Sequence, residues 1–341
     1  MAALSRRSFI PMLGTAILGA SCLSFENQST DEPTNIILPQ RLKKGDTIGV
    51  CAPAGAMGNP KDIVEFKLKL QKLGLKIKVG PNVEERYGYF SANDTDRAKE
   101  FMDFVSDDEV QGIFFIRGGW GCARILEHLD FDIIQNNPKV IMGFSDITTL
   151  LNAITAKTGL VTFHGPGGNS TWNEYSLRYI EDLLFNGELV KYQNTPEDHK
   201  IITYSSGISN GELYGGNLSV LTSLIGSDYL PDWKGKILFL EDVMEEPYRI
   251  DRMLTQLQLS GILDQVDGIV LGNFRKCTAE EPHKSFTLEE VFSQHFKNFR
   301  KPVYFGAQIG HIRNKFTTPV GTKVEINADL GTITLLQTSV A

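Results

Sequence analysis

Short apolar segments alternate with segments of helical periodicity from residue 46 onward, and this alternation restricts the fold more than any other feature of the sequence. Apolar runs at 47–52, 112–116 and 140–142 predict buried strands, each followed by a turn that contains glycine. The helices that we expect after strands in this half lie at about 60–73, 97–104, 123–129 and 147–157. Strands that alternate with helices pair in parallel, so a mainly parallel sheet with helices on both faces is expected.

The second half of the chain is richer in strands and turns. Apolar strands are expected at 237–240 and 268–272, with a helix at 250–259 between them and a strand pair near the C-terminus. This pattern predicts a mixed sheet or a partial barrel, and a polar run at 185–200 marks the connection to the first half. The predicted division is an N-terminal α/β domain at 41–185, a connector at 186–205 and a C-terminal β-rich domain at 206–341.

The first residues have the layout of a twin-arginine export signal. Arg6 and Arg7 precede an apolar stretch that is too short to span a bilayer, which needs roughly 20 apolar residues. Cys22 follows small residues, as the lipid-accepting cysteine of a bacterial lipoprotein does. We therefore expect an export signal at 1–22, a polar tether at 23–40 and an exported, periplasmic protein, which lipidation of Cys22 would anchor to the membrane. The alternatives are a frayed terminus or short buried helix, and a Cys22 without lipid.

Composition excludes several kinds of partner and site. The formal net charge is −7 and the basic residues are scattered, so no basic face is available for nucleic acid. The cysteines show no CxxC spacing, and no histidine pair has the HExxH spacing of a zinc site. We therefore expect neither a nucleic-acid partner nor a metal site.

The segment 143–146 (GFSD) stands between an apolar strand and a helix, where a tight turn can present a side chain for reaction. Such a turn would expose the hydroxyl of Ser145 and place the amide N–H of Asp146 at the helix N-terminus, where it could stabilise an oxyanion. The alternative is that Ser145 or Asp146 only caps the helix. The segment lacks the second glycine of G-x-S-x-G, so it is not a standard α/β-hydrolase elbow.

The segment 117–121 (RGGWG) also follows a buried strand and precedes a helix. Its glycines let the backbone approach a ligand closely, so Gly118 or Gly119 could supply a second oxyanion donor. A dinucleotide-binding fingerprint would require glycine where Arg124 stands. A tight turn without a ligand is the alternative.

Glu241 and His311 each follow an apolar stretch. The strand at 237–240 runs into Glu241, and a buried carboxylate needs a partner such as an imidazole. His311 follows the apolar run at 303–309 and is the candidate partner. The alternatives are a solvated acidic turn and a structural histidine. Both residues, like Ser145, would stand at ends of apolar strands, where α/β sheets place their ligands, and this coincidence favours a catalytic triad.

Six segments, in this order, resemble the LD-carboxypeptidase family of serine peptidases, which also contains the microcin C immunity peptidase. They are 117–121 (RGGWG), 143–148 (GFSDIT), 215–218 (GGNL), 239–242 (FLED), 247–252 (PYRIDR) and 310–311 (GH). The resemblance extends from about Arg41 to the C-terminus. It implies an α/β protein with a flavodoxin-like N-terminal domain, of the class I glutamine amidotransferase type, and a smaller β-rich C-terminal α+β domain.

The resemblance also implies a site between these domains, with Ser145 as nucleophile, His311 as general base and Glu241 as the acid that orients it. The residues implied for the oxyanion hole are Gly119 and Asp146. Those implied for substrate contact are Gly118, Trp120 and Asn217. Homodimers are usual in the family, and no metal or organic cofactor is implied.

The expected reaction is hydrolysis, through an acyl-enzyme on Ser145, of the bond between the L-configured centre of a diamino acid and the terminal D-alanine of a murein tetrapeptide. Family members that recycle murein peptides act in the cytoplasm, whereas this chain carries an export pattern, so its substrate could be a periplasmic peptidoglycan stem. Two alternatives stay open. One is a microcin C-type immunity hydrolase that cleaves peptidyl or aminoacyl nucleotides, and the other is a non-catalytic two-domain binding lipoprotein.

Overall fold

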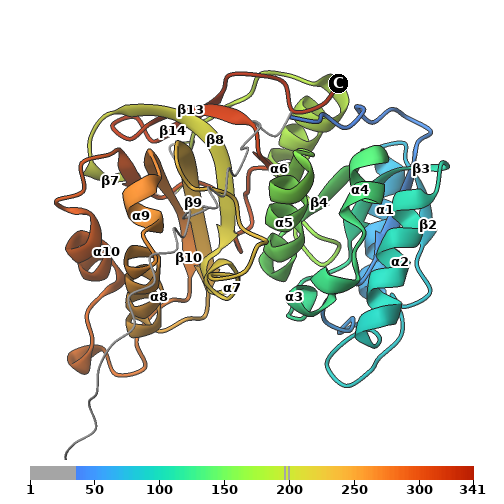
Figure 1. Cartoon of the computed structure of the whole chain (residues 1–341), viewed down its shortest axis with the longest axis horizontal. Coiled ribbons are helices and arrows are strands. Elements are labelled where there is room, and N and C mark those ends of the chain that lie inside the picture. Colours follow the sequence, from blue (N-terminus) through green and yellow to red (C-terminus); the bar gives the residue numbers. More distant parts are fainter. Residues whose placement is uncertain (1–35, 196, 199) are drawn as a thin grey trace, which may run out of the picture. The chain divides into compact units, whose positions relative to one another are not determined.

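The structure, a computed structural model, describes residues 36–195, 197–198 and 200–341. The predicted export signal, Cys22 and most of the predicted tether lie outside the described residues. The described chain forms two β-sheets with helices packed against them (Figure 1). Among these residues, no helix has both the length and the apolar composition that crossing a bilayer requires.

The first sheet has the strand order β12-β5-β4-β3-β1-β2. Its strands are β1 (Thr47–Cys51), β2 (Lys76–Val79), β3 (Val110–Phe115), β4 (Val140–Gly143), β5 (Thr162–His164) and β12 (Thr318–Val320). β1 to β5 pair in parallel, as the alternation predicted, and β12 returns from the C-terminal region to pair antiparallel with β5. β1 and β4 are buried almost throughout, because helices cover both faces of the sheet.

The helices of this half begin and end where local chemistry dictates. They are α1 (Lys61–Lys72), α2 (Asp94–Ser106), α3 (Cys122–Ile125), α4 (Phe131–Asn136), α5 (Thr148–Thr158) and α6 (Glu174–Ile180), which continues into a π-helical turn at Glu181–Asn186. The side chain of Asn93 caps α2 by accepting a hydrogen bond from the amide of Asp96 at 2.9 Å. α1 stops before Gly74, whose φ of +79° ends the helix as expected.

The second sheet is mixed, with the strand order β6-β14-β13-β8-β9-β10-β11-β7. Its strands are β6 (Lys191–Tyr192), β7 (Ile202–Ser205), β8 (Ile208–Asn217), β9 (Lys236–Val243), β10 (Gly268–Arg275), β11 (Val303–Phe305), β13 (Lys323–Asn327) and β14 (Thr332–Leu335). β8 to β11 are parallel, and antiparallel strands flank them on both sides. The prediction of a mixed sheet is confirmed, and with it the fold class.

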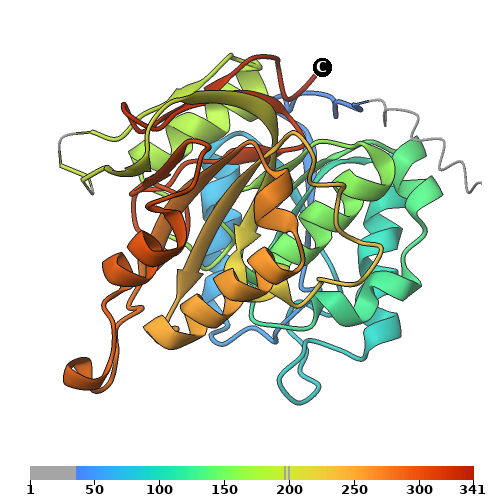
Figure 2. The ribbon, with the colours of Figure 1, turned by 60° about the vertical axis from the view of Figure 1, so that its left-hand side comes forward.

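Four helices of the second half are α7 (Leu218–Thr222), α8 (Pro247–Leu259), α9 (Ile262–Gln265) and α10 (Leu288–Phe296). α9 and α10 both pack against α8, and the three lie on one face of the second sheet (Figure 2). β6 and β7 come from the segment 186–205, which we predicted to be a connector.

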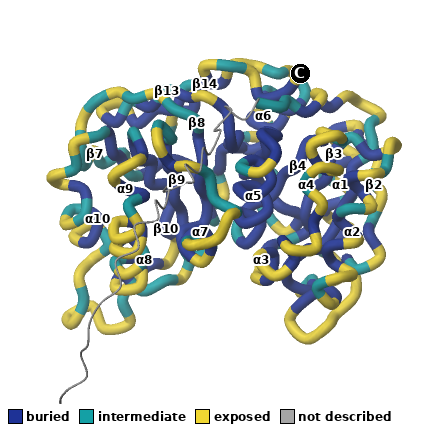
Figure 3. The backbone as a smooth tube through the Cα atoms, viewed as in Figure 1, coloured by how far each residue is buried: buried dark blue, intermediate teal, exposed yellow. Residues whose placement is uncertain are grey.

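α5 lies between the two sheets and is buried on almost all sides. Nine of its 11 residues are buried, so it stands out as a dark helix between the sheets in Figure 3. Its neighbours include β4 and β5 of the first sheet and β8 of the second. A helix that is covered all round must pair its buried polar side chains, and α5 carries several threonines and Asn152.

Asn152 joins α5 to the second sheet through the backbone of Gly215. Its amide group donates to the Gly215 carbonyl at 2.8 Å, and its side-chain oxygen accepts from the Gly215 N–H at 3.2 Å. Thr148 Oγ1 accepts a further hydrogen bond from the amide of Asn217 at 3.0 Å. β13 pairs with β8 only as far as Glu212, so this stretch of β8 has an open edge on the side of α5. The side chains of α5 satisfy backbone groups that would otherwise be buried without partners.

We predict that Asn152→Ala lowers the free energy of unfolding by about 3 kcal/mol, because it leaves the buried N–H and C=O of Gly215 without partners. Urea denaturation followed by circular dichroism measures this loss. Asn136→Ala removes an exposed amide that bonds within its own helix, and we expect it to change stability by less than about 0.5 kcal/mol. Equal stability of the two variants would contradict the role given to Asn152.

Candidate active site

Ser145 lies in the tight turn between β4 and α5. Its φ is +63°, a left-handed conformation that serine rarely adopts, and its side chain is half-buried. A strained turn of this kind is how hydrolase folds present a nucleophilic serine. The N-cap of α5 is Ile147, which makes no side-chain cap hydrogen bond, so neither Ser145 nor Asp146 caps that helix. The helix-cap alternative is therefore wrong.

The loop at 117–121 passes directly beside Ser145. A Cβ atom built on Gly118 would lie 2.8 Å from Ser145 Cβ and 3.1 Å from the amide nitrogen of Asp146, so any side chain at position 118 would collide with the serine. Gly119 has a φ of +111° and lies against Gly55 instead. Of the two glycines considered for the oxyanion hole, Gly118 is the one in contact with the Ser145 side chain.

Two buried side chains hold this loop in place. Asp146 Oδ2 accepts a hydrogen bond from the amide of Cys122 at 2.8 Å, and Arg97 of α2 donates to the carbonyl of Gly121 at 3.1 Å. Burial raises the pKa of Asp146, and the hydrogen bonds from Cys122 and the charge of Arg97 oppose that rise. The Asp146 carboxylate therefore fixes the loop relative to the turn that carries Ser145.

Glu241 and His311 form a hydrogen-bonded pair. His311 Nδ1 lies 2.7 Å from Glu241 Oε2, and the Glu241 side chain is fully buried. Burial by itself would raise the pKa of Glu241, but the charge and hydrogen bond of His311, helped by His164 and Asn217, hold the pKa of Glu241 below its usual value. A fully buried carboxylate excludes the solvated acidic turn that we considered as an alternative.

The positions of this pair in the fold differ from the prediction. Glu241 lies inside β9 and not at its end, and His311 lies in the loop that follows β11. Gly310 allows this loop to approach Glu241 closely, because a Cβ atom at position 310 would lie only 2.7 Å from Glu241 Oε2. Its φ of +119° is also a conformation that suits glycine alone. The ring of His311 packs on Phe144, the residue before Ser145, at a centroid distance of 4.8 Å. The structure thus places His311, the partner of Glu241, against the residue that directly precedes Ser145.

Asn217 links two neighbouring buried carboxylates. Its amide nitrogen lies 3.3 Å from Glu241 Oε1 and 3.1 Å from Asp242 Oδ1, and its side-chain oxygen caps α7. Asp242 also accepts hydrogen bonds from the backbone and hydroxyl of Ser219. Burial, together with the charge of Glu241, raises the pKa of Asp242 to about 6. Because all of these contacts lie within the protein, Asn217 holds the Glu241 side chain in position.

His164, at the end of β5, is a second buried histidine beside Glu241. Its Nε2 lies 4.0 Å from Glu241 Oε1 and makes no hydrogen bond among the described residues. The rings of Phe144 and Phe239 pack edge-on against it. Burial lowers the pKa of His164 to about 4, against the attraction of Glu241. The imidazole is therefore neutral at physiological pH.

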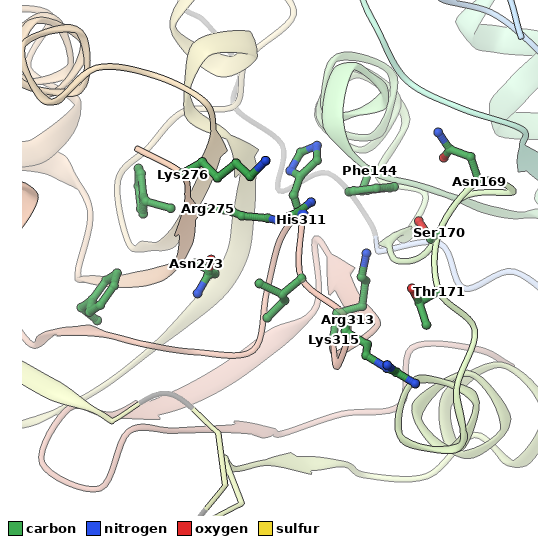
Figure 4. Close-up of a pocket in the computed structure, with 13 residues that line it drawn as sticks. Phe144, Asn169, Ser170, Thr171, Asn273, Arg275, Lys276, His311, Arg313 and Lys315 are labelled. Carbon is green, nitrogen blue, oxygen red and sulfur yellow. The ribbon is translucent and has the colours of Figure 1, made fainter. Parts of the chain in front are cut away.

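A cavity of about 780 Å³ opens beside His311. Its lining, drawn in Figure 4, consists of Phe144, Asn169, Ser170, Thr171, Asn273, Phe274, Arg275, Lys276, Phe305, His311, Ile312, Arg313 and Lys315. Arg275 and Lys276 approach His311 from one side, and the polar run Asn169, Ser170 and Thr171 faces them across the cavity (Figure 4). The cavity is large enough for a small peptide.

Trp120 lies elsewhere. It is 49% exposed, its ring packs at a tilt against Tyr89 and Phe90 at centroid distances of 5.5 and 5.2 Å, and it does not line this cavity. The contact with substrate that we predicted for Trp120 stays a prediction.

Comparison with known proteins identifies the family. The model of the LD-carboxypeptidase N-terminal domain matches residues 48–165, and that of the C-terminal domain matches residues 210–326. The chain belongs to the LD-carboxypeptidase family. This membership confirms the resemblance found in the sequence motifs, and it makes the chain a peptidase.

Relatives of this LD-carboxypeptidase include a probable murein peptide carboxypeptidase of Bacillus subtilis, which is 37% identical over 291 residues, or 85% of this chain and 91% of the relative. Among solved structures, microcin C7 self-immunity protein MccF in complex with aspartyl sulfamoyl adenosine superposes with a TM-score of 0.82 at 29% identity, over 89% of this chain and 100% of that chain. Muramoyltetrapeptide carboxypeptidase from Oxalobacter formigenes superposes with a TM-score of 0.73 at 28% identity, over 85% and 97% of the two chains.

Sequence reasoning missed His164 and the basic side chains of the cavity. The signal for His164 was present, because Gly159 ends a helix and the apolar run at 160–163 then leads into the histidine, as at the other parallel strands. No comparable signal exists for Arg275 and Lys276, because their place beside His311 follows from the packing of distant segments.

We predict that His164 makes this LD-carboxypeptidase less stable in acid. The pKa of His164 is about 4 in the fold and 6.5 in an unfolded chain, so between these pH values only the unfolded state takes up the proton. The free energy of unfolding should fall by about 3 kcal/mol more in the wild type than in His164→Gln as the pH drops from 6.5 to 4. Urea denaturation of both proteins across this range tests the difference. The exposed His283→Gln should follow the wild type, whereas parallel pH profiles for His164→Gln and the wild type would contradict the prediction.

Proposed function

We propose that this LD-carboxypeptidase releases the terminal D-alanine of murein tetrapeptides, with Ser145 as nucleophile, His311 as general base and Glu241 as the acid that orients it. The observation that carries the proposal is the 2.7 Å contact between His311 Nδ1 and the fully buried Glu241 Oε2. The relatives named as murein peptide and muramoyltetrapeptide carboxypeptidases support the choice of substrate.

The chemistry follows from the orientation of the imidazole. With Nδ1–H donated to Glu241, His311 Nε2 can accept the proton of Ser145 Oγ, and the anionic Glu241 stabilises the imidazolium that forms. Oγ attacks the carbonyl carbon before D-alanine, the C–N bond breaks, and the imidazolium gives its proton to the departing amine. Water, deprotonated by His311, then hydrolyses the acyl-enzyme and restores the serine.

The oxyanion formed in both steps would be bound by backbone amides. We propose Asp146 and the loop amide of Gly119 or Gly118 as donors. The close approach of Gly118 to Ser145 and to the Asp146 amide supports this assignment. For Asn217 we propose a positioning role in place of the predicted substrate contact, because its amide bonds to Glu241 and Asp242.

A second candidate is an immunity hydrolase that cleaves aminoacyl nucleotides. The superposition on MccF, solved with aspartyl sulfamoyl adenosine, favours it. The triad and the acyl-enzyme would be the same in both cases. Comparing turnover of a murein tetrapeptide with that of an aminoacyl sulfamoyl adenylate separates the two candidates.

We predict that Ser145→Ala lowers D-alanine release from a murein tetrapeptide by about 10⁴-fold or more, because no other group can form the acyl-enzyme. Amino-acid analysis of the products measures the release. Ser145→Gly should be equally inactive and unfold at no lower temperature than the wild type, since glycine adopts a φ of +63° without strain. Near-normal turnover by either variant would disprove the assignment. Labelling of the wild type alone by a serine-directed phosphonate would exclude a non-catalytic binding protein.

We also propose that the protein is exported to the periplasm, which Arg6, Arg7 and the apolar stretch behind them support. Mass spectrometry of the protein from its native host should find a mature chain that lacks both arginines. A chain that begins at a diacylglyceryl-modified Cys22 would establish the membrane anchor, and an unprocessed N-terminus would contradict export. The homodimer implied by the family stays a prediction.

A further inference from the structure

The imidazole of His164 carries a polar atom that the fold leaves unpaired. The residue is 2% exposed, and its Nε2 is buried without a hydrogen-bond partner among the described residues. The rings of Phe144 and Phe239 that pack against it are apolar. An unpaired polar atom in such surroundings costs stability, so an apolar side chain would be the better core residue. A core position that keeps such an atom is a candidate for a functional role.

The unpaired nitrogen lies beside a carboxylate oxygen that is short of donors. His164 Nε2 is 4.0 Å from Glu241 Oε1, whereas His311 contacts the other oxygen, Oε2. From the described part of the chain, Oε1 accepts one hydrogen bond, at 3.3 Å from the Asn217 amide. That amide also binds Asp242, at 3.1 Å. A carboxylate can accept about four hydrogen bonds, so Oε1 has room for a further donor.

His164 meets Glu241 as a neutral N–H donor. Burial lowers the pKa of His164 to about 4, against the attraction of Glu241, and repulsion from His311 and Lys315 adds to the decrease. Glu241 lies on β9, and the other two residues lie on the loop after β11. A lone pair on Nε2 would repel the carboxylate, so the neutral ring carries its proton on Nε2. His164 can therefore donate to Glu241 without adding a positive charge beside His311.

A small movement would close the contact between His164 and Glu241. It amounts to about 1 Å, because N–H···O hydrogen bonds form at about 3 Å. Hydrogen bonds between catalytic groups are often long in the free enzyme and shorten in the reaction complex. The donor matters most when Ser145 attacks, because Glu241 must then keep its charge and its position to stabilise the imidazolium of His311.

We propose that His164 is a positioning residue of the active site, whose Nε2–H binds Glu241 Oε1 and holds the charged carboxylate against His311. The proposal rests on the proposed function. Glu241 would then be held at both oxygens, by His311 at Oε2 and by His164 and Asn217 at Oε1, which fixes the plane of the carboxylate. His164 does not line the cavity, so its loss should reduce the rate of reaction and not the binding of substrate.

His164→Leu tests the proposal, because it removes the donor and keeps the volume filled. We expect kcat for D-alanine release by the full chain to fall about 10- to 100-fold, the range of a hydrogen bond to a charged group, with KM changed less than about twofold. The variant should unfold at the same or a higher temperature, because an unpaired polar atom leaves the core. His164→Met is a second variant without a donor, and its flexible side chain adapts if leucine does not fit.

Two further variants separate the donor from the packing. His164→Gln places an amide N–H close to the position of Nε2 and should restore most of the lost rate. Tyr204→Phe is the matched control, because Tyr204 Oη is also buried without a partner among the described residues but packs against Phe292 and Phe296. It should leave kcat unchanged. Unchanged kcat in both donor-free variants, or a loss in His164→Gln as large as theirs, would overturn the proposal.

The rate of labelling by a serine-directed phosphonate separates this proposal from the choice of substrate. Labelling requires an activated serine and does not require the peptide. We expect His164→Leu to be labelled about 10- to 100-fold more slowly than the wild type and His164→Gln to recover most of that rate. A wild type that is labelled but releases no D-alanine would contradict the proposed substrate and leave the role of His164 standing. Equal labelling of the wild type and His164→Leu would contradict that role, and no labelling of the wild type would contradict both proposals.

Discussion

The contact between α5 and β8 fixes the turn that carries Ser145 relative to the strands that carry Asn217 and Glu241. Ser145 precedes α5 in the first sheet, whereas Asn217 ends β8 and pairs with Glu241 on β9 in the second. Asn152 and Thr148 bond to the backbone of β8 within a buried setting, where a hydrogen bond is both strong and costly to lose. The turn that carries Ser145 is therefore linked to Glu241 through α5 and Asn217 by a short series of hydrogen bonds.

The adjacent carboxylates of Glu241 and Asp242 differ in their hydrogen-bond partners and in their pKa values. Glu241 and Asp242 are both buried on β9, but their side chains have different partners. Glu241 faces an imidazole, which keeps it charged, while Asp242 is bound by hydroxyl, amide and backbone donors and has a pKa of about 6. Asn217 donates to both and so couples a residue proposed for catalysis to one that anchors α7. The different surroundings of the two carboxylates therefore shift their pKa values in opposite directions.

The sequence allowed β1, β3 and β4 of the first sheet, the serine turn and the partner of Glu241 to be predicted, because each depends on local pattern or on simple chemistry. A strand followed by glycine and a helix identifies the turn at Ser145, and a carboxylate at the end of an apolar run calls for a cationic or imidazole partner. β12 and the short strands β6 and β7 were not predicted, because two to four residues carry too little pattern. The cations around His311 depend on tertiary packing, which no local window contains.

β12 crosses from the second half of the chain to complete the first sheet. Its residues Thr318 to Val320 pair with β5, and Thr318 lies opposite His164. The segment between β11 and β12 carries His311 and Lys315, so it is anchored in one sheet at its start and in the other at its end. The N-terminal half alone would leave the edge of β5 unpaired and would lack His311, the residue that we propose as general base. A break in the chain between the two halves would therefore remove a strand from the first sheet as well as divide the candidate site.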